Sequence, residues 1–468
     1  MRPLLDELHP VPDPLDLLAR VRGASHVAWL DAAADHDDLG RVSVLAWDPV
    51  ATVTLAAAQW AAQRDALRTT LGHVTHEPEG PAFQGGWIGW LGYELGAAFD
   101  AQPIATRNDL DLPDGELALY DLAVVWDHAT GRAWLVSTGI DADGLPDATR
   151  AATRRAAARA TLAQSPVPGG ARTAPSRARQ GGALHAFHDA PPGLVSDFTA
   201  ESYRAAVRLV IDGILEGEIF QANLSWRATA PFAGDPLALY QAMRRRAPAA
   251  LGAFLEQPTR QVLSVSPERF LAFDATTRRV ETRPIKGTRP RDADPARDAA
   301  LAADLAGSAK DRAENVMIVD LLRNDLARVA ETGTVAVPAL CRLESHAAVH
   351  HLTSIVTAVV RPEHDALDLL AATFPGGSIT GAPKLRAMAM LATLEPVIRG
   401  PYCGAIGWLG LDGSLALSVA IRTLTVTDGT VAIHAGGGIT ALSEPIAEYE
   451  ETLDKARALV AAVAEVRA

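Results

Sequence analysis

The chain has 468 residues and a formal net charge of −13 at pH 7, with 48% hydrophobic and 21% charged residues. This length and composition are typical of a large globular protein with enough apolar residues for an extensive core. The negative charge argues against a general nucleic-acid-binding protein, because neutralising phosphates requires a basic face. It does not exclude small anionic substrates, since a pocket can be locally basic within an acidic protein.

The two cysteines, Cys341 and Cys403, allow no disulfide framework and lack the spacing of a metal site. The N-terminal residues are interrupted by acids and prolines, which is not the pattern of a signal peptide. No apolar run approaches the length that spans a membrane. We therefore expect a soluble cytoplasmic protein.

Three regions follow one another along the chain. Residues 1–150 contain short strand-like runs such as RVSVLAWDP and GGWIGWLGYEL, whose alternation and aromatic content favour β-sheet. Residues 151–196 are rich in Ala, Arg, Pro, Gly and Ser; RAATRRAAARATLA predicts a helix and the segment after it a flexible linker. Residues 197–468 alternate between predicted helices and strands.

The third region begins with a predicted amphipathic helix, SYRAAVRLVIDGILEG, that ends at Gly217 and precedes a strand, IFQANLSWRATA. The segment QVLSVSPERFLAFDATTRRVETRPIKGT predicts a hairpin. KDRAENVMIVDLLRNDLARV predicts a long helix, with apolar residues at 316, 319, 322, 326 and 329.

The C-terminal part of the region predicts more sheet and a last helix. IGWLGLDGSLALSVAIRTLTVTDGTVAIHAGGGI predicts three strands joined by Asp-Gly turns, which favours antiparallel pairing. The last helix begins at about Pro445, because proline is suited to a first helical turn.

The stretch ETRPIKGTRPR places Lys286 where a predicted strand ends, with arginines at 283, 289 and 291. Lys286 is therefore either a surface residue or an amine held in a pocket. Glu268 begins a strand of the same predicted hairpin. The acid and the amine could thus share a site, or could form a plain ion pair.

Acidic residues recur at one spacing on two predicted helices. In AEYEETLDKA, Glu448, Glu451 and Lys455 share one helical face, and Asp311 and Glu314 repeat the spacing on the earlier helix. Four carboxylates supply the oxygen ligands that Mg²⁺ prefers. A solvated face of ion pairs is the commoner explanation of such a pattern.

Residues 435–439, AGGGI, are predicted to lie between a strand and a helix, where backbone N–H groups could hold a carboxylate or phosphate. A glycine turn without a ligand is the alternative, and the match to a dinucleotide-binding motif is weak. Arg422, in a strand of small and apolar residues, needs either a substrate carboxylate or a structural ion pair. His350 and His351 point to opposite faces of a strand, so only one of them can line a given pocket.

Ten segments of the chain resemble, in sequence and in order, those of the chorismate-utilising enzymes. They are GEIFQANLS, SPERFL, RPIKGTRPR, KDRAENVMIVDLLRNDLARV, VHHLTSIV, FPGGSITGAPKLRAM, YCGAIGWL, SVAIRTL, AGGGI and EYEETLDKARAL. The resemblance covers nearly the whole chain. It implies an α+β fold of two large, mostly antiparallel sheets packed face to face with helices outside, to which both halves contribute.

Within this family, lysine in the motif PIxGT is typical of the members that form 4-amino-4-deoxychorismate, whereas alanine is typical of those that form anthranilate. This chain has Lys286. The resemblance implies that the lysine amine attacks C2 of chorismate and that ammonia then enters at C4. A lysine among arginines and beside a divalent cation would have its ammonium form disfavoured, which favours this chemistry.

Other readings of the resemblance remain open. An anthranilate-forming enzyme is the first alternative within the family. Isochorismate- and salicylate-forming relatives also have a lysine here, which they use to activate water. A non-catalytic chorismate-binding subunit is the alternative from a different class, and a nucleotide-binding enzyme is a distant one.

By the same resemblance, Glu268 is the general acid or base and Mg²⁺ is the cofactor. Glu314 and Glu451 match the principal metal positions, with Asp311 and Glu448 supporting through water. Asp311 stands where glutamate is common, which makes a direct metal bond there doubtful. The residues implied to bind chorismate are Tyr402, Arg422, Gly437 and Gly438 at the pyruvyl carboxylate, His351 and Thr380 beside the ring, and Lys455 for charge balance.

The chain has no recognisable glutaminase segment. Ammonia would therefore come from solution or from a glutamine amidotransferase subunit on a separate chain. The product would be used in 4-aminobenzoate and folate biosynthesis after aromatisation by another enzyme.

Overall fold

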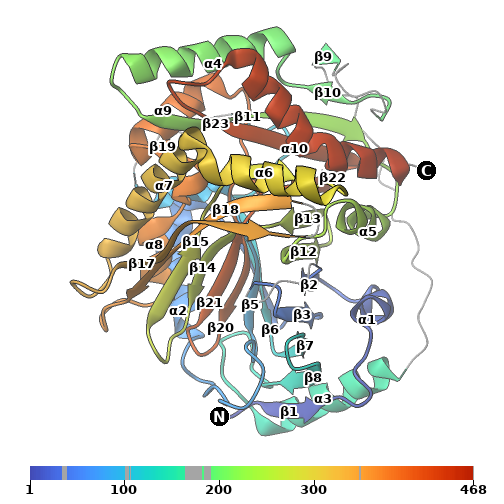
Figure 1. Cartoon of the computed structure of the whole chain (residues 1–468). Helices are drawn as coiled ribbons and strands as arrows, with labels where there is room; N and C mark the ends of the chain where they lie inside the picture. Colours follow the sequence, from blue (N-terminus) through green and yellow to red (C-terminus); the bar gives the residue numbers. More distant parts are fainter. Residues whose placement is uncertain are drawn as a thin grey trace.

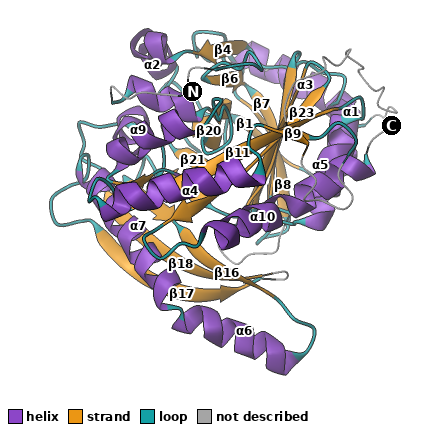
Figure 2. Ribbon diagram, turned by 90° about the horizontal axis from the view of Figure 1, so that it is seen from above, coloured by secondary structure: helices purple, strands orange, loops and turns teal. Residues whose placement is uncertain are grey.

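The computed structural model describes residues 1–33, 39–100, 105, 107–163, 182–183, 191–346 and 349–466 of the chain. Two large sheets form the body, and helices lie outside them (Figures 1 and 2). Every strand pairing within the described residues is antiparallel. The predicted α+β fold is confirmed.

The larger sheet joins strands from both halves of the chain. In order across it lie β1 (Leu4–Glu7), β8 (Arg132–Ser137), β7 (Leu122–Asp127), β3 (Val42–Ala46), β2 (Val27–Asp31), β12 (Leu251–Glu256), β13 (Arg260–Ser266), β22 (Thr423–Thr427), β23 (Thr430–Ile439), β11 (Gln221–Pro231), β10 (Val195–Ser196) and β9 (Gly182–Ala183), with β19 (Gly381–Ala382) on β11. The two halves meet where β2 pairs with β12.

The smaller sheet is shared in the same way. Its strands are, in order, β16 (Ile285–Pro290), β18 (Val349–Val359), β15 (Arg279–Arg283), β14 (Arg269–Phe273), β21 (Leu415–Val419), β20 (Ala405–Gly410), β5 (Gly86–Leu91), β6 (Gly115–Tyr120) and β4 (Ala51–Leu55), with β17 (Ala336–Ser345) on β18. Here the halves meet where β20 pairs with β5. Strands on either side of the predicted linker thus share both sheets.

Apolar side chains from the two sheets pack together between them. Val125 and Leu255 of the larger sheet belong to the same buried cluster as Ile88 and Ile406 of the smaller one. Burying both inner faces removes a large apolar area from water, which is the main force that holds the two sheets together.

The outer faces are covered by helices. Buried side chains of α1 (Pro14–Val21), α3 (Ala148–Leu162), α4 (Ala200–Leu215), α5 (Pro236–Arg246), α9 (Lys384–Leu394) and α10 (Pro445–Glu465) pack on the larger sheet. Those of α2 (Trp60–Thr69), α7 (Ala309–Ala327) and α8 (Ala366–Thr373) pack on the smaller one. The remaining helical segments are α6 (Pro295–Gly307) and the short 3-10 helices η1 (Ala57–Gln59), η2 (Tyr93–Ala98) and η3 (Gly377–Ile379).

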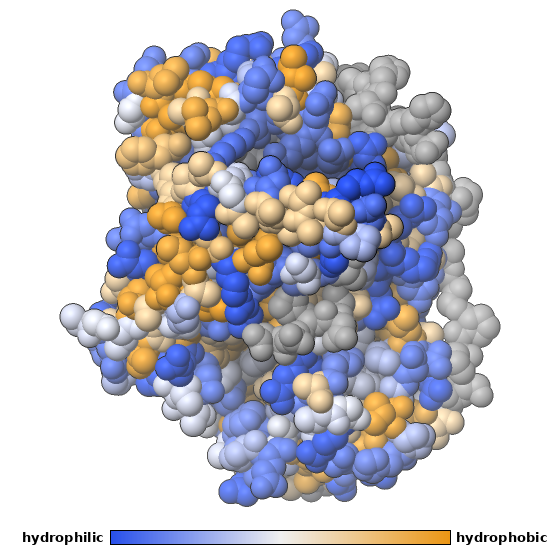
Figure 3. Space-filling view, viewed as in Figure 1, coloured by the Kyte–Doolittle hydropathy of each residue, from blue (hydrophilic) through white to orange (hydrophobic). Residues whose placement is uncertain are grey.

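Some apolar side chains remain on the surface. Leu209 and Leu215 of α4 and Leu385 of α9 are exposed, and Figure 3 shows apolar atoms gathered over the region of these two helices. Within the described ranges, no helix combines the length and the hydrophobicity that crossing a membrane requires.

Several predicted elements are confirmed. Helix α4 ends just before Gly217, and α10 begins at Pro445, with the Glu444 side chain capping its first turn. In α7 the predicted apolar positions are buried except Val316, which is exposed. The predicted helix after residue 150 is part of α3, whereas residues 164–181 and 184–190 of the predicted linker lie outside the described residues.

Three predictions of local structure are corrected, the first of them in part. The hairpin predicted within residues 261–288 is formed by β14 and β15, but the residues before Glu268 belong to β13, which lies in the larger sheet. The C-terminal segment forms β20, β21, β22 and β23, so it has four strands rather than three. Finally, residues 435–439 are the end of β23 and not a turn.

The glycines of β23 allow the neighbouring strand, β11, to come very close. A Cβ atom on Gly436 would lie 2.6 Å from the carbonyl oxygen of Leu224 on β11. Glycine therefore serves close backbone packing here, a role that a sequence pattern does not distinguish from a turn.

Candidate active site

A cavity of about 590 Å³ collects most of the predicted site residues. Strand β16, the end of β23, the N-terminal turns of α7 and α10, and η3 all contribute to its walls. A pocket of this size accommodates a small ring compound with several polar substituents. Helices α7 and α10 are far apart in sequence, and the fold brings their acidic N-terminal turns to one cavity.

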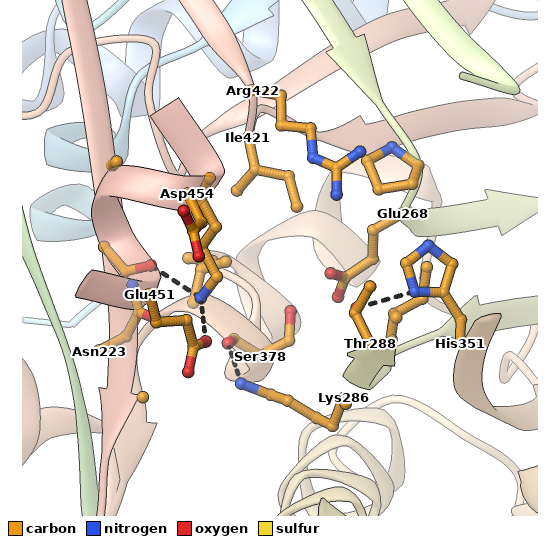
Figure 4. Close-up of a pocket in the computed structure, with 18 of the residues that line it drawn as sticks. Asn223, Glu268, Lys286, Thr288, His351, Ser378, Ile421, Arg422, Glu451 and Asp454 are labelled. Carbon is orange, nitrogen blue, oxygen red and sulfur yellow. Dashed lines mark hydrogen bonds and ion pairs between the residues drawn. The ribbon is translucent and has the colours of Figure 1, made fainter. Parts of the chain in front are cut away.

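Lys286 lies near the start of β16 with its side chain in this cavity (Figure 4). Its Nζ is 2.9 Å from Glu314 Oε1 and donates a 3.0 Å hydrogen bond to the carbonyl oxygen of Ser378. Burial acts to lower the pKa of Lys286, but the carboxylates of Glu314, Glu268 and Glu451 outweigh it and hold the pKa above its ordinary value. The structure therefore favours the ammonium form.

The expected effect of the neighbouring arginines on Lys286 is wrong, because these arginines have partners elsewhere. Arg283 donates to Glu281 and Arg289 to Asp304. The charges that raise the pKa of Lys286 are those of carboxylates, and no guanidinium group is among the influences on it.

Glu268 lies where the chain passes from β13 to β14, that is, from one sheet to the other. Its side chain lines the cavity and is buried, and burial raises the pKa of Glu268 to about 7. A hydrogen bond with the Ser378 side chain and the charge of Lys286 act in the opposite direction but do not cancel the effect of burial. A carboxyl group with this pKa carries a transferable proton near neutral pH, as a general acid requires.

All four predicted metal-binding carboxylates line the cavity, and each has a basic partner. Glu451 is 2.8 Å from Lys455, and Asp311 is 3.4 Å from Arg289. The remaining ion pairs are those of Glu314 with Lys286 at 2.9 Å and of Glu448 with Lys310 at 3.2 Å.

The chemistry of these oxygen donors fits Mg²⁺. Their arrangement, however, is that of carboxylates closed on basic side chains: within the described residues, no three acidic, histidine or cysteine side chains come together as a metal-binding group. Glu314 and Glu451 both act to raise the pKa of Lys286, although the Glu314 side chain is 11% exposed and that of Glu451 is 54% exposed.

Arg422 lies just before β22 and is partly buried in the cavity wall (Figure 4). Across the described part of the chain, no group pairs with its guanidinium, and burial lowers the pKa of Arg422. A buried cation without a protein partner is unfavourable, and a bound carboxylate would satisfy it. Tyr402 lies in the same wall, with its ring stacked on that of His434 at 5.0 Å.

Gly438 and Gly437 differ in their surroundings. A Cβ on Gly438 would lie 2.6 Å from Glu314 Oε1 and 2.2 Å from Nε2 of Gln221, so the site has no room for a side chain there. A Cβ on Gly437 would instead meet Glu448 at 3.5 Å, an ordinary contact distance.

The two adjacent histidines point to opposite faces, as predicted. His351 lines the cavity and shares a 2.9 Å hydrogen bond with Thr288 Oγ1, whereas His350 bonds to Asp298 at 3.0 Å outside it.

Thr380 does not line the cavity: it is fully buried, and its hydroxyl donates to the carbonyl oxygen of Gly376.

Sequence reasoning missed several residues of the cavity. Ser378 contributes its backbone carbonyl to Lys286, and a backbone group leaves no signal in residue type. Asn223 lies inside a strand, where a single polar residue attracts little notice. Lys310 also lines the cavity, but a lysine near the start of a predicted helix is ordinarily a solvated surface residue.

Comparison with known proteins defines the class. Residues 25–461 match the chorismate binding enzyme family, and the chain belongs to this family. It is 38% identical over 451 residues to aminodeoxychorismate synthase component 1 of Escherichia coli K12, covering 92% of each chain. It is also 40% identical over 406 residues to anthranilate synthase component 1 of Streptomyces coelicolor, covering 86% of this chain and 78% of that one.

The fold agrees with this membership. A crystal structure of anthranilate synthase component I from Streptococcus pneumoniae superimposes with a TM-score of 0.75 at 28% identity, covering 91% of this chain and 93% of that one. A menaquinone-specific isochorismate synthase from Escherichia coli shares the fold, with a TM-score of 0.73 at 21% identity. Relatives with different products are therefore similar to this chain, and overall identity does not choose among them.

Proposed function

We propose that this chain converts chorismate and ammonia to 4-amino-4-deoxychorismate through a covalent intermediate on Lys286. The observation that carries the proposal is a buried lysine whose amine faces the same cavity as Glu268, a carboxyl group with its pKa raised to about 7. A nucleophile and a proton donor in one enclosed site are the two groups that this displacement needs.

The proposed reaction has two substitutions. First, the amine of Lys286 forms a bond to C2 of chorismate, the ring double bond shifts, and the C4 hydroxyl leaves as water after Glu268 protonates it. Ammonia then bonds to C4, the double bond shifts back, and the lysine nitrogen leaves C2. The sum is one chorismate and one ammonia giving one 4-amino-4-deoxychorismate and one water, with the pyruvyl ether retained.

Binding is assigned to the groups that have no protein partner or that point into the cavity. Arg422 would hold the pyruvyl carboxylate with Tyr402 and the backbone of Gly438 beside it, because its guanidinium otherwise lacks a counterion. His351 would lie beside the ring and Lys455 would balance charge.

The attack requires a neutral amine, whereas the carboxylates around Lys286 favour its ammonium form. A Mg²⁺ ion held by Glu314 and Glu451 would neutralise these carboxylates and hold the ring carboxylate of chorismate. With Glu314 neutralised, burial would become the dominant influence on Lys286 and would lower its pKa.

Ammonia would be supplied by a glutamine amidotransferase subunit on a separate chain. The product would then serve 4-aminobenzoate and folate biosynthesis after a separate lyase step. Both statements belong to the proposal and rest on the similarity to aminodeoxychorismate synthase component 1.

The test is a product assay with purified protein, chorismate, Mg²⁺ and ammonium, read by mass spectrometry. We expect 4-amino-4-deoxychorismate, which retains the pyruvyl group, and no product without ammonium. Anthranilate, which has lost that group, would support the second candidate, favoured by the 40% identity to an anthranilate synthase component. A hydroxylated product formed without ammonium would instead indicate an isochorismate-type reaction.

A further inference from the structure

Lysine is rare in this chain and concentrated in the cavity. Among 43 lysines and arginines, lysine occurs only at positions 286, 310, 384 and 455. Three of these line the cavity, each paired with a predicted metal-binding carboxylate. The fourth, Lys384, pairs with buried Asp325 at 2.6 Å.

Lys310 has the least obvious role of the three. It lies at the N-terminus of α7, and its Nζ is 3.2 Å from Oε1 of Glu448 on α10, so it joins the two acidic helices directly. The Glu448 side chain is only 4% exposed and also accepts a 2.6 Å hydrogen bond from the hydroxyl of Ser443. A carboxylate this deeply buried needs a counterion, and in this structure Lys310 provides it.

The chemistry of lysine suits a counterion that must leave. An arginine holds a carboxylate through two parallel N–H groups, whereas an ammonium is a compact charge on a flexible chain. The Lys310 side chain is 42% exposed, so its charge can move into water without a large desolvation penalty. Outside the cavity, the described ion pairs that involve a lysine or an arginine use arginine, with the single exception of Lys384.

We propose that Lys310 is the exchangeable counterion of Glu448: it neutralises this carboxylate while no cation is bound, is displaced when a divalent cation binds, and thereby sets the affinity of the cavity for that cation. This inference rests on the proposed function, which places Mg²⁺ among these carboxylates. It assigns Lys310 no contact with the reacting atoms, so Lys310 is a positioning residue.

The experiment measures Mg²⁺ binding directly, by calorimetry on the whole cation-free protein without chorismate. Removing the competing charge in Lys310→Met should tighten Mg²⁺ binding about two- to fivefold, the effect expected for one partly exposed ion pair. Lys310→Arg should weaken it below the wild type, because the guanidinium holds Glu448 more firmly. The control is Arg312→Met, which removes one exposed positive charge from the same helix and should change binding much less.

Each outcome decides between the possibilities. Unchanged or weaker binding by Lys310→Met, with the wild type binding normally, overturns the inference and leaves the proposed function intact. Absence of Mg²⁺ binding by the wild type overturns both the inference and the metal part of the proposed function. If Lys310→Met does not fold, as judged by circular dichroism, the comparison of Lys310→Arg with the wild type decides: weaker binding supports the inference, and equal or tighter binding overturns it.

Discussion

The ammonium nitrogen of Lys286 lies 2.9 Å from a carboxylate oxygen of Glu314, and both side chains are only 11% exposed. A buried ion pair is weak evidence for stability, because removing two charges from water offsets most of their attraction. Such a pair in a cavity wall is better explained by function. It holds the amine of Lys286 in place, beside a carboxylate that raises the pKa of that amine.

We expect Lys286→Met to abolish formation of 4-amino-4-deoxychorismate, with a loss of at least about a thousandfold in turnover, because no other amine is held at the same position. Mg²⁺ binding should survive, since Glu314 keeps its carboxylate and loses only a competing charge. The measurements are the ammonium-dependent product assay and calorimetric titration with Mg²⁺. Normal turnover by this variant would show that the lysine does not take part in the chemistry.

A trapping experiment tests the covalent step separately. Wild-type protein incubated with chorismate and Mg²⁺, without ammonium, should accumulate an adduct on Lys286, because the second substitution lacks its nucleophile. Peptide mass spectrometry would locate the adduct. Adduct at Lys384, which is buried and paired with Asp325, would point to non-specific reaction.

Glu268 should set the alkaline limb of the pH profile. Because burial raises the pKa of this carboxyl group to about 7, it loses its proton as the pH rises through 7, and turnover should fall with it. Glu268→Gln should lower turnover by about a hundredfold or more, since an amide cannot protonate the leaving hydroxyl. The Glu268→Asp variant changes the position of the carboxyl group. If the alkaline limb lies at the same pH in this variant, another group is responsible for it.

The same pKa shift makes a prediction for stability. The folded protein retains a proton on Glu268 that the unfolded chain, with a carboxyl pKa near 4.3, has already lost, so the free energy of unfolding should fall between about pH 4 and 7. Glu268→Gln removes this loss and should be more stable than the wild type at pH 8, by about 3–4 kcal/mol. The difference should vanish near pH 4. Denaturant unfolding at the two pH values measures it.

Sequence reasoning reached the general plan of the site because its main groups are identified by residue type and position. Lys286 is predicted at the end of a strand and lies instead near the start of β16. The carboxylates at helical spacing do indicate which side chains can meet, and the fold brings Lys286, Glu314 and Glu451 to one cavity. It failed where geometry depends on contacts between distant segments. The role of the Ser378 carbonyl and the burial of Thr380 are set by how η3 packs, which no local pattern reports.

The fold, like the site, could be predicted where the signal is local and not where distant segments pair. The start of helix α10 could be placed from Pro445, because a proline acts locally on the first helical turn. The assignment of β13 to one sheet and β14 to the other could not, since the chain changes sheet within two residues, Pro267 and Glu268, and no local pattern reports that change. The charge effect on Lys286 was also inaccessible, because it depends on which partners the neighbouring arginines find.

Arg422 should control binding of chorismate more than turnover. With no protein counterion in the described residues, its guanidinium gains a charge-assisted hydrogen bond only when substrate binds, a contribution of about 1.5–3 kcal/mol. Arg422→Met should therefore raise KM for chorismate about ten- to a hundredfold while kcat changes little. It should also raise the thermal stability of the chorismate-free protein, because an uncompensated buried cation is removed. An unchanged KM with lower stability would indicate a structural role.

Gly438 and Gly437 provide a matched pair of variants within β23. A methyl group on Gly438 would lie 2.6 Å from Glu314 Oε1 and 2.2 Å from Nε2 of Gln221, so the ends of both side chains must shift. The same change at Gly437 meets its nearest atom, on Glu448, at 3.5 Å and needs no displacement. We expect Gly438→Ala to lower turnover by about a hundredfold or more, because displacing a positioned group by about 1 Å has costs of this size.

Gly437→Ala should retain most activity, and both variants should keep the backbone amides that the strand supplies. Turnover and Mg²⁺ affinity measured side by side separate a local clash from general damage to β23. Equal losses in the two variants would mean that the strand as a whole, and not the space reserved for Glu314, limits the reaction. If only Gly438→Ala loses turnover, and its Mg²⁺ binding is also weaker, the absence of a side chain at position 438 is required for the position of the Glu314 carboxylate.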